Sequence, residues 1–204
     1  MIALIDYKAG NLTSVKKALA TIGAEVFVPE APGDLADAGG IIVPGVGHFG
    51  ATRALDQAWT DAILARVGEG RPLFGICLGM HWLFEGSDEA PELSGLGLLS
   101  GRCYRLGTVR LQPDQTIKVP HVGWNSLAVQ REGGLIDHVP DGSQVYFTHS
   151  YAAPVTGDTS AVTEHGETFA SVVQRGHIGG VQFHPEKSGD VGLRILRNFV
   201  ELVD

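Results

Sequence analysis

Short apolar runs alternate with segments of helical periodicity through the first half of the chain. Four runs are almost continuously apolar: Ile2 to Ile5, Val26 to Val28, Ile41 to Val43 and Leu73 to Ile76. Such runs are typical of parallel strands that are buried on both faces. Between the first two, apolar residues recur at helical spacing: Leu12, Val15, Leu19 and Ile22. Gly23 is placed to end this helix and Asn11 or Thr13 to cap its start, so the pattern predicts an α/β fold with an open, mostly parallel sheet and helices on both faces.

The pattern changes in the second half of the chain. From Arg102 to Val129, short alternating stretches such as 109–111 and 127–129 are separated by turn residues, which predicts antiparallel strands added to the central sheet. A closing helix is predicted over Gly189 to Val203, with one apolar stripe: Val191, Ile195, Phe199 and Val203. No repeat or linker interrupts the chain, so we expect a single domain over residues 1–204.

Composition narrows the class of protein. With 204 residues and 44% apolar side chains the chain is long enough to bury a substantial core, and a net charge of −8 argues against nucleic acid or an anionic membrane as the main partner. No apolar run approaches the roughly 18 residues that span a bilayer. The start, Met1 to Asp6, lacks the basic residues of a signal peptide and is expected to form the first strand. The two cysteines, Cys77 and Cys103, form no disulfide framework, so we expect a reducing, cytoplasmic setting with Cys103 as a packed thiol.

Cys77 lies between glycines in the stretch Gly75-Ile76-Cys77-Leu78-Gly79, directly after an apolar run. This spacing has the form of a nucleophile elbow, where a strand turns sharply into a helix and exposes a reactive side chain. The unpaired N–H groups at the helix N-terminus would favour the thiolate, which is the nucleophilic form of cysteine. A buried, unreactive thiol is the alternative for a lone cysteine.

A base for this thiol is available where a second apolar strand ends in His184-Pro185-Glu186. Pro185 disfavours a helical conformation for His184, and Glu186 can accept a hydrogen bond from one ring nitrogen. The other nitrogen is then free to take the thiol proton and deliver it to a leaving amine. Because Cys77 and His184 each follow a strand, they are expected to meet at the carboxyl edge of the sheet.

A third strand runs into the glycine-rich loop Pro44-Gly45-Val46-Gly47. Its backbone N–H groups are candidates for an oxyanion hole, although the loop alone also fits an ordinary turn between a strand and a helix. Neither a dinucleotide fingerprint nor a phosphate loop is found in the sequence. Metal-binding spacings are also absent, and four histidines have no constellation around them and are expected on the surface or in loops: His48, His138, His165 and His177.

Taken together, these stretches resemble the class I (triad) glutamine amidotransferases. The segments 74–80 and 180–188 carry that resemblance, and three further segments are similar to the glutaminase subunits of imidazole glycerol phosphate synthases: residues 6–12, 118–125 and 146–151. The resemblance implies a flavodoxin-like fold, no cofactor and hydrolysis of the glutamine side-chain amide through a cysteine thioester. It also implies a cyclase subunit with a (β/α)8 barrel as the partner in a heterodimer that serves histidine biosynthesis.

The resemblance carries residue roles to matching positions. It implies Cys77, His184 and Glu186 as the catalytic triad, and the N–H groups of Val46 and Leu78 as the oxyanion donors. Four residues are implied in binding glutamine: Gly47, His81, Ser150 and Tyr151. His81 is a departure, since glutamine is common at this position in the family, and it can donate one hydrogen bond to the substrate without presenting a paired donor and acceptor.

The partner surface is implied in the same way at six residues: Asn11, Pro120, His121, Trp124, Asn125 and Lys187. For Trp124, core packing is an equal alternative. Two other functions stay open from the sequence. One is a triad glutaminase that serves anthranilate, aminodeoxychorismate or guanylate synthesis, and the other is a non-catalytic binding subunit of the same fold.

Overall fold

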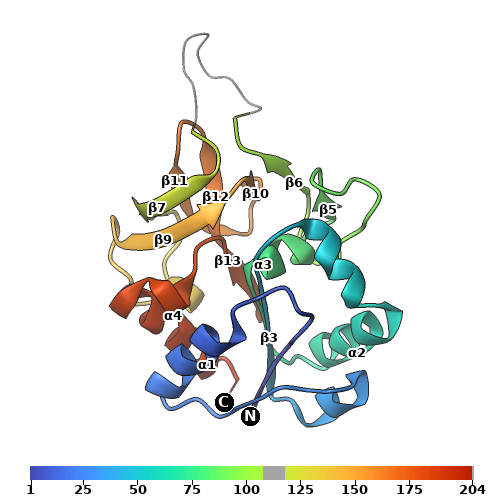
Figure 1. Cartoon of the computed structure of the whole chain (residues 1–204). Helices are drawn as coiled ribbons and strands as arrows, with labels where there is room; N and C mark the ends of the chain where they lie inside the picture. The colour runs from blue at the N-terminus through green and yellow to red at the C-terminus, as the bar shows by residue number, and fades with distance from the viewer. Residues whose placement is uncertain (108–117, 204) are drawn as a thin grey trace.

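The computed structural model describes residues 1–107 and 118–203. Within these residues a large central sheet organises the fold (Figure 1). Its strands follow one another in space as β2 (Val26–Phe27), β1 (Ile2–Leu4), β3 (Gly40–Gly45), β4 (Leu73–Cys77), β13 (Ile178–Val181), β12 (Thr168–Arg175), β11 (Thr159–Glu164) and β8 (Ala128–Val129). The pairs from β2 to β13 are parallel and those from β13 to β8 are antiparallel. The parallel part has the flavodoxin-like order, which confirms the predicted fold class.

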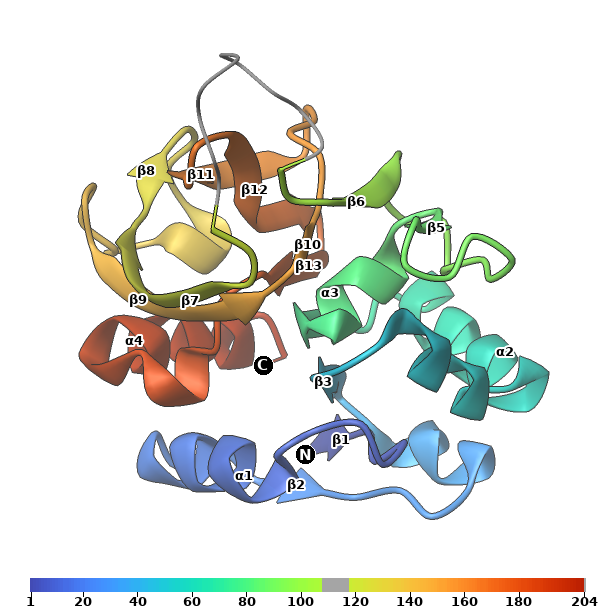
Figure 2. The same ribbon diagram turned by 45° about the horizontal axis from the view of Figure 1, so that its top comes forward.

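Helices cover both faces of this sheet (Figure 2). One face carries α1 (Leu12–Thr21) and α4 (Gly189–Glu201), and the other carries α2 (Gln57–Gly68) and α3 (Leu78–Leu83). Because successive side chains of a strand point to opposite faces, β1 contributes to two cores. Ile2 and Leu4 pack with α1 and α4, whereas Ala3 and Ile5 pack with α2 and α3.

The predicted first and last helices are both present. Asn11 caps α1, since its side-chain oxygen accepts a hydrogen bond from the Ser14 N–H at 3.3 Å, and Gly23 follows the helix with a φ of 78° that glycine tolerates. In α4, Ile195 and Phe199 are buried as the apolar stripe predicts. The Phe199 ring stacks on Phe74 of β4 with 5.0 Å between centroids, which holds the helix against the sheet.

The segment from 102 to 129 differs from the prediction. Only β8 joins the central sheet, while β6 (Arg102–Arg105) lies between β10 (Tyr151–Ala152) and β5 (Gly86–Ser87), and β7 (His121–Ser126) pairs with β9 (Gln144–His149). The predicted stretch 109–111 lies outside the described residues. The antiparallel extension is formed instead by β11 and β12, because strand partners are set by contacts distant in sequence that local alternation does not encode.

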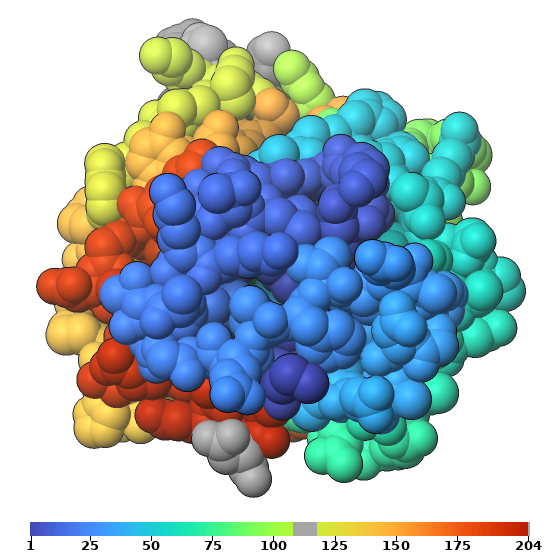
Figure 3. All heavy atoms as spheres, turned by 60° about the horizontal axis from the view of Figure 1, so that its bottom comes forward, coloured from blue at the N-terminus to red at the C-terminus, as the bar shows by residue number. Residues whose placement is uncertain are grey.

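Four short 3-10 helices complete the described elements: η1 (Pro32–Asp37), η2 (Phe49–Ala54), η3 (Gly134–Ile136) and η4 (Pro185–Lys187). Figure 3 shows the face of the molecule at the bottom of Figure 1, where the start of the chain and α1 (blue) lie beside α4 (red). In the part of the chain that the structure describes, no helix is long and apolar enough to cross a membrane.

The carboxyl ends of three adjacent strands meet at the other edge of the sheet. In the parallel register Gly45 of β3 lies beside Cys77 of β4, and Val181 of β13 lies beside Ile76. The residues that follow β13 therefore continue alongside Cys77. This places the Val46 loop, Cys77 and His184 on three neighbouring strand ends, which is where open α/β sheets bind their ligands.

Candidate active site

Cys77 ends β4 and begins α3 in the strained geometry of an elbow, with φ 52° and ψ −106°. The two flanking glycines make this turn possible. A Cβ atom at Gly79 would lie 1.7 Å from the Val43 carbonyl oxygen, and one at Gly75 would lie 2.5 Å from the Met80 nitrogen. Only glycine lets α3 approach β3 and β4 this closely, and the predicted elbow is confirmed. The Cys77 residue is buried, with 6% of its surface exposed.

His184 lies beyond β13 with its ring enclosed between Cys77 and Glu186. The His184 Nδ1–H donates to Glu186 Oε1 at 2.9 Å, and both side chains are 3% exposed. The other ring nitrogen, Nε2, is buried and has no partner of regular hydrogen-bond geometry among the described residues. Burial lowers the pKa of His184, but hydrogen bonding and charge from Cys77 and Glu186 outweigh it and raise this pKa to about 9.

A pKa of about 9 means that His184 carries a proton at neutral pH. The sequence predicts that this imidazole removes the thiol proton as the reaction begins. In this structure the His184 ring has Cys77 on one side and the Glu186 carboxylate on the other, and removal of the thiol proton by His184 stays a prediction. Cys77 makes the largest contribution to the raised pKa of His184, and the buried Glu186 carboxylate adds to it from the other side of the ring.

Ser188 fixes the backbone around this base. Its hydroxyl donates to the His184 carbonyl oxygen at 2.6 Å and accepts from the Tyr146 N–H at 3.0 Å, while the His184 N–H donates to the Tyr146 carbonyl oxygen at 2.9 Å. The base is thus tied to β9 as well as to β13. No role for Ser188 is predicted from the sequence, although a serine two residues after His-Pro-Glu is a signal that could reveal such a brace.

A pocket of about 270 Å³ opens over Cys77. It is lined by Gly47, Cys77, Leu78, His81, Glu89, Pro120, Thr148, His149, Ser150 and Tyr151. The structure therefore gathers all four residues predicted to bind the substrate around the predicted nucleophile. Three lining residues were not predicted: Glu89, Thr148 and His149. Glu89 Oε2 accepts from the Phe49 N–H at 2.7 Å and so fixes the loop after Gly47, a contact that its isolated position in the sequence does not reveal.

Val46 departs from its predicted role. Its N–H donates to the Ala9 carbonyl oxygen at 2.7 Å, so this conformation does not present it to an oxyanion. The direction of a peptide N–H depends on a rotation about the backbone, which residue types do not specify. Leu78 is different, because it is the first residue of α3 and its N–H has no partner within the helix.

His81 lines the pocket, yet one of its ring nitrogens is already used. Its Nε2 lies 2.7 Å from Gln182 Oε1, and the amide oxygen can only accept, so Nε2 carries the proton. The remaining nitrogen, Nδ1, is then an acceptor, so the predicted donation to the substrate is replaced by acceptance. Burial lowers the pKa of His81 to about 4, and the ring is neutral at neutral pH.

The residues predicted to meet a partner fall into two groups. Trp124 is 57% exposed and meets the Tyr146 ring edge-on, and the Lys187 ammonium lies 5.7 Å from the centre of that ring. Asn11 and Pro120 are also exposed, and Asn125 is partly exposed. His121 is the correction, because it is 4% exposed and donates to His149 inside the fold. Its place in β7 turns it to the face opposite Trp124.

Two further predictions concern residues away from the site. Cys103 is fully buried, as expected of a packed thiol. His165 lies in the loop between β11 and β12, as predicted, and its ring stacks on His121 with 4.1 Å between centroids. Among the described residues no cluster of histidine, cysteine and acidic side chains has the arrangement of a metal site.

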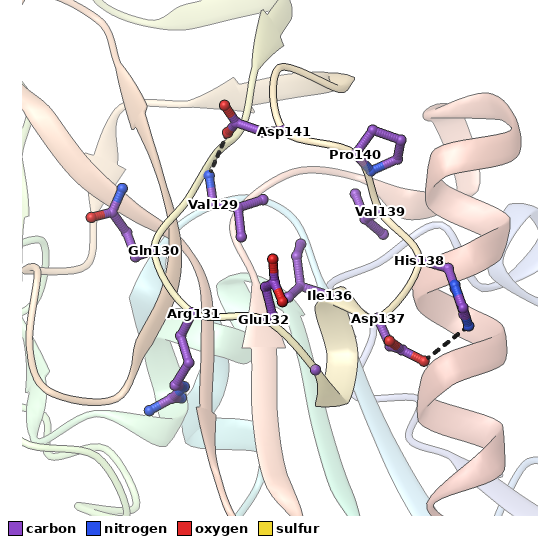
Figure 4. A pocket seen from close by; sticks show the side chains of 11 residues that line it. Val129, Gln130, Arg131, Glu132, Ile136, Asp137, His138, Val139, Pro140 and Asp141 are labelled. Carbon is purple, nitrogen blue, oxygen red and sulfur yellow. Dashed lines mark hydrogen bonds and ion pairs between the residues drawn. The ribbon is translucent and has the colours of Figure 1, made fainter.

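A larger hollow of about 700 Å³ lies within the loop from Val129 to Asp141 (Figure 4). Two of its three carboxylates have partners: Asp141 accepts from the Val129 N–H at 2.8 Å, and Asp137 pairs with His138 at 3.4 Å. None of the predicted catalytic or substrate-binding residues lines it. The pocket over Cys77 is therefore the candidate active site.

Comparison with known proteins agrees with this geometry. Residues 3–203 match the family described as class I glutamine amidotransferase. A protein of Halobacterium salinarum named imidazole glycerol phosphate synthase subunit HisH is 47% identical, with 98% of this chain and 92% of the relative covered. A protein of the same name from Moorella thermoacetica is 46% identical, with 99% and 95% covered.

Solved structures support the fold. A crystal structure of a glutamine amidotransferase superposes with a TM-score of 0.76 at 24% identity, covering 100% of this chain and 99% of that one. The glutaminase domain of Trypanosoma brucei CTPS with bound acivicin superposes with a TM-score of 0.64 at 15% identity, covering 98% and 93%. At these identities the likeness concerns the fold alone.

Proposed function

The chain belongs to the class I glutamine amidotransferase family, and we propose that it is the glutaminase subunit of an imidazole glycerol phosphate synthase. One observation carries the chemistry: the thiol of Cys77, the imidazole of His184 and the carboxylate of Glu186 follow one another beneath a pocket of about 270 Å³. The pathway follows from relatives of that name that are similar over nearly the whole chain.

The reaction proceeds through a thioester. The Cys77 sulfur attacks the side-chain carbonyl carbon of glutamine, and the Leu78 N–H stabilises the resulting oxyanion. As the carbon–nitrogen bond breaks, the His184 imidazolium gives its proton to the departing ammonia. The neutral imidazole then takes a proton from water, and the hydroxide attacks the thioester carbonyl. Glutamate leaves, the sulfur recovers its electron pair, and His184 is again protonated.

The pocket supplies groups that match the rest of glutamine. The Glu89 carboxylate complements the α-ammonium of the substrate, and Nδ1 of His81 can accept a hydrogen bond from it or from the side-chain amide. Gly47, Ser150 and Tyr151 also line the pocket, and their backbone groups can fix the orientation of the substrate. A single glutamine molecule therefore fits in the pocket with its side-chain amide directed at Cys77.

A second oxyanion donor requires a local change. Because the Val46 N–H is bonded to Ala9 in this structure, the peptide between Gly45 and Val46 has to rotate before Val46 can join Leu78. Removing one such donor typically costs about 3 to 4 kcal/mol of transition-state stabilisation. The resting subunit is therefore expected to hydrolyse glutamine slowly until this bond breaks.

The proposed partner is the cyclase subunit with a (β/α)8 barrel. Ammonia released into water would be protonated and diluted, so its transfer requires an acceptor site docked close to Cys77. The exposed side chains of Trp124 and Lys187, together with Pro120 at the rim of the pocket, offer a surface for that subunit. The cyclase would use the ammonia to form imidazole glycerol phosphate and an aminoimidazole carboxamide ribotide.

The test uses the complex of both subunits. A Cys77→Ala variant should abolish synthesis from glutamine while synthesis from added ammonium salts continues. Glutamine hydrolysis at the parent rate by this variant would refute the proposed nucleophile. Rescue of a histidine-requiring strain by the chain separates this pathway from anthranilate, aminodeoxychorismate and guanylate synthesis. Labelling of Cys77 by a glutamine-analogue alkylator, read by mass, would exclude a non-catalytic binding subunit.

A further inference from the structure

Gln182 lies between the Cys77 nucleophile and the pocket residue His81, and it has no part in the proposed reaction steps. Its side chain is fully buried, directly after β13. The amide nitrogen Nε2 lies 3.7 Å from Cys77 Sγ and donates to it, while the amide oxygen Oε1 lies 2.7 Å from His81 Nε2. A buried chain of hydrogen bonds therefore runs from His81 through Gln182 to the sulfur.

The charge on the sulfur determines which atom of the Gln182 amide faces it, and so the direction of these hydrogen bonds. If the amide of Gln182 were turned over, its oxygen would face the sulfur, and a negative sulfur would repel that oxygen. With Nε2 toward the sulfur, the amide stabilises the thiolate, and Oε1 is left to accept from His81. His81 must then hold its proton on Nε2, which its neutral ring can do in one tautomer.

Besides His184, His81 and Tyr7, the titratable side chains of Glu89 and His149 line the pocket that opens over the sulfur. His184 faces it from the end of β13 as the imidazolium, and His81 reaches it only through Gln182. Tyr7, from the loop after β1, is buried, and its pKa is raised by burial and by the charge of Cys77, so the phenol is neutral. Gln182 is thus an uncharged donor to the sulfur whose action does not depend on pH.

We propose that Gln182 is a positioning residue for the Cys77 nucleophile and that His81 sets the orientation of its amide. This inference rests on the proposed glutaminase function, in which the sulfur attacks as the thiolate. It also explains how the protein functions with histidine at position 81, because the ring supplies the one hydrogen-bond donor that Gln182 needs. A glutamine at position 81 can supply the same donor, whereas an apolar residue cannot.

The test measures alkylation of Cys77 by iodoacetamide across a range of pH, without glutamine, with the labelled peptide quantified by mass. Gln182→Met keeps the length of the side chain and removes the donor. It should slow alkylation at pH 7 about tenfold and move the midpoint of the profile up by about one pH unit. His81→Met should change the profile in the same direction, and His81→Gln should stay within about twofold of the parent.

A matched control is Ser171→Ala, on the strand paired with β13. The Ser171 hydroxyl makes a buried hydrogen bond of 2.7 Å to Thr163, and its carbonyl oxygen accepts from the Gln182 N–H, so the variant removes a buried hydrogen bond without touching Cys77. Its alkylation profile should match the parent. Circular dichroism verifies that each variant is folded. If Gln182→Met does not fold, the comparison of His81→Met with His81→Gln tests the proposal instead.

The outcomes separate the inference from the function on which it rests. A Gln182→Met profile that overlays the parent profile, in a folded protein, overturns the positioning role. A His81→Gln profile that follows His81→Met overturns the role of His81 as donor. If Cys77 of the parent itself fails to react at pH 7, the proposed nucleophile is wrong, whatever the variants do.

Discussion

The Nδ1 atom of His121 lies 2.9 Å from the Nε2 atom of His149, and the direction of this hydrogen bond is fixed. His149 Nδ1 lies 2.8 Å from the Tyr151 carbonyl oxygen, which can only accept, so Nδ1 holds the proton of that ring. His149 Nε2 is then an acceptor, and His121 donates to it. The Asn125 side-chain N–H, 3.2 Å from His121 Nε2, completes the chain. Two neutral imidazoles thus connect the Asn125 side chain of β7 to the backbone of Tyr151 at the substrate pocket.

Breaking this chain of hydrogen bonds should destabilise the protein. His121→Phe keeps the stacking on Phe147, whose centroid lies 4.7 Å away, but leaves the buried Nε2 of His149 without a donor. We expect a loss of about 1–3 kcal/mol in the free energy of unfolding at pH 7, measured with urea. His165→Phe is the control, because the His165 ring stacks on His121 but takes no part in these hydrogen bonds. Equal losses in the two variants would contradict the prediction.

Acid should weaken the fold through two buried histidines, His149 and His81. Burial lowers the pKa of His149 to about 3 and that of His81 to about 4, against about 6.5 in an unfolded chain. Between these values the unfolded state binds more protons, so stability present above pH 6.5 is lost as the pH falls toward 4. The loss should be on the order of 1 kcal/mol per pH unit for each of the two rings. Urea unfolding at pH 7, 6 and 5 measures it, and a constant free energy would contradict it.

Much of this arrangement is predictable from local sequence, and the reasons are physical. Cys77 and His184 each follow an apolar run, and parallel strands bring their carboxyl ends to one edge whatever the connections between them. The orientation of the Val46 peptide is not predictable, because several rotations are open to the same residues. The burial of His121 is also not predictable from the sequence. The alternation of residues along β7 shows that a polar residue occupies this position, but not that its ring has partners on β9.

Glu186 should control the alkaline limit of activity. The His184 imidazolium protonates the leaving ammonia, so glutamine hydrolysis by the complex should fall as the pH rises through about 9. Glu186→Gln can still accept from Nδ1 but removes the charge that helps to raise the pKa of His184. The alkaline limit should therefore move down by about 1–2 pH units, and the rate should fall roughly 10²-fold. Glu164→Gln, an exposed carboxylate on β11, should leave the pH profile unchanged.

The bond between Val46 and Ala9 should break when an oxyanion forms. In the free subunit the Val46 N–H is held at 2.7 Å from the Ala9 carbonyl oxygen, so its amide should exchange slowly with solvent. A glutamine-derived aldehyde that forms a tetrahedral adduct with Cys77 offers an oxygen that competes for this donor. NMR of the adduct should show that the Val46 amide has lost its partner on Ala9. A crystal structure of the adduct with that bond intact would refute the second oxyanion donor.

The closeness of α3 to β3 is the most demanding feature of the elbow, and Gly79 makes it possible. A methyl group there would lie 1.7 Å from the Val43 carbonyl oxygen, which belongs to the backbone and cannot move alone. Gly79→Ala should therefore destabilise the fold by more than about 4 kcal/mol or prevent folding. Gly68→Ala, at the end of α2 with no atom within 4 Å of the added methyl group, should be neutral or stabilising by up to about 1 kcal/mol. Urea unfolding of both variants measures the difference, and similar stabilities would show that β3 can retreat from the elbow.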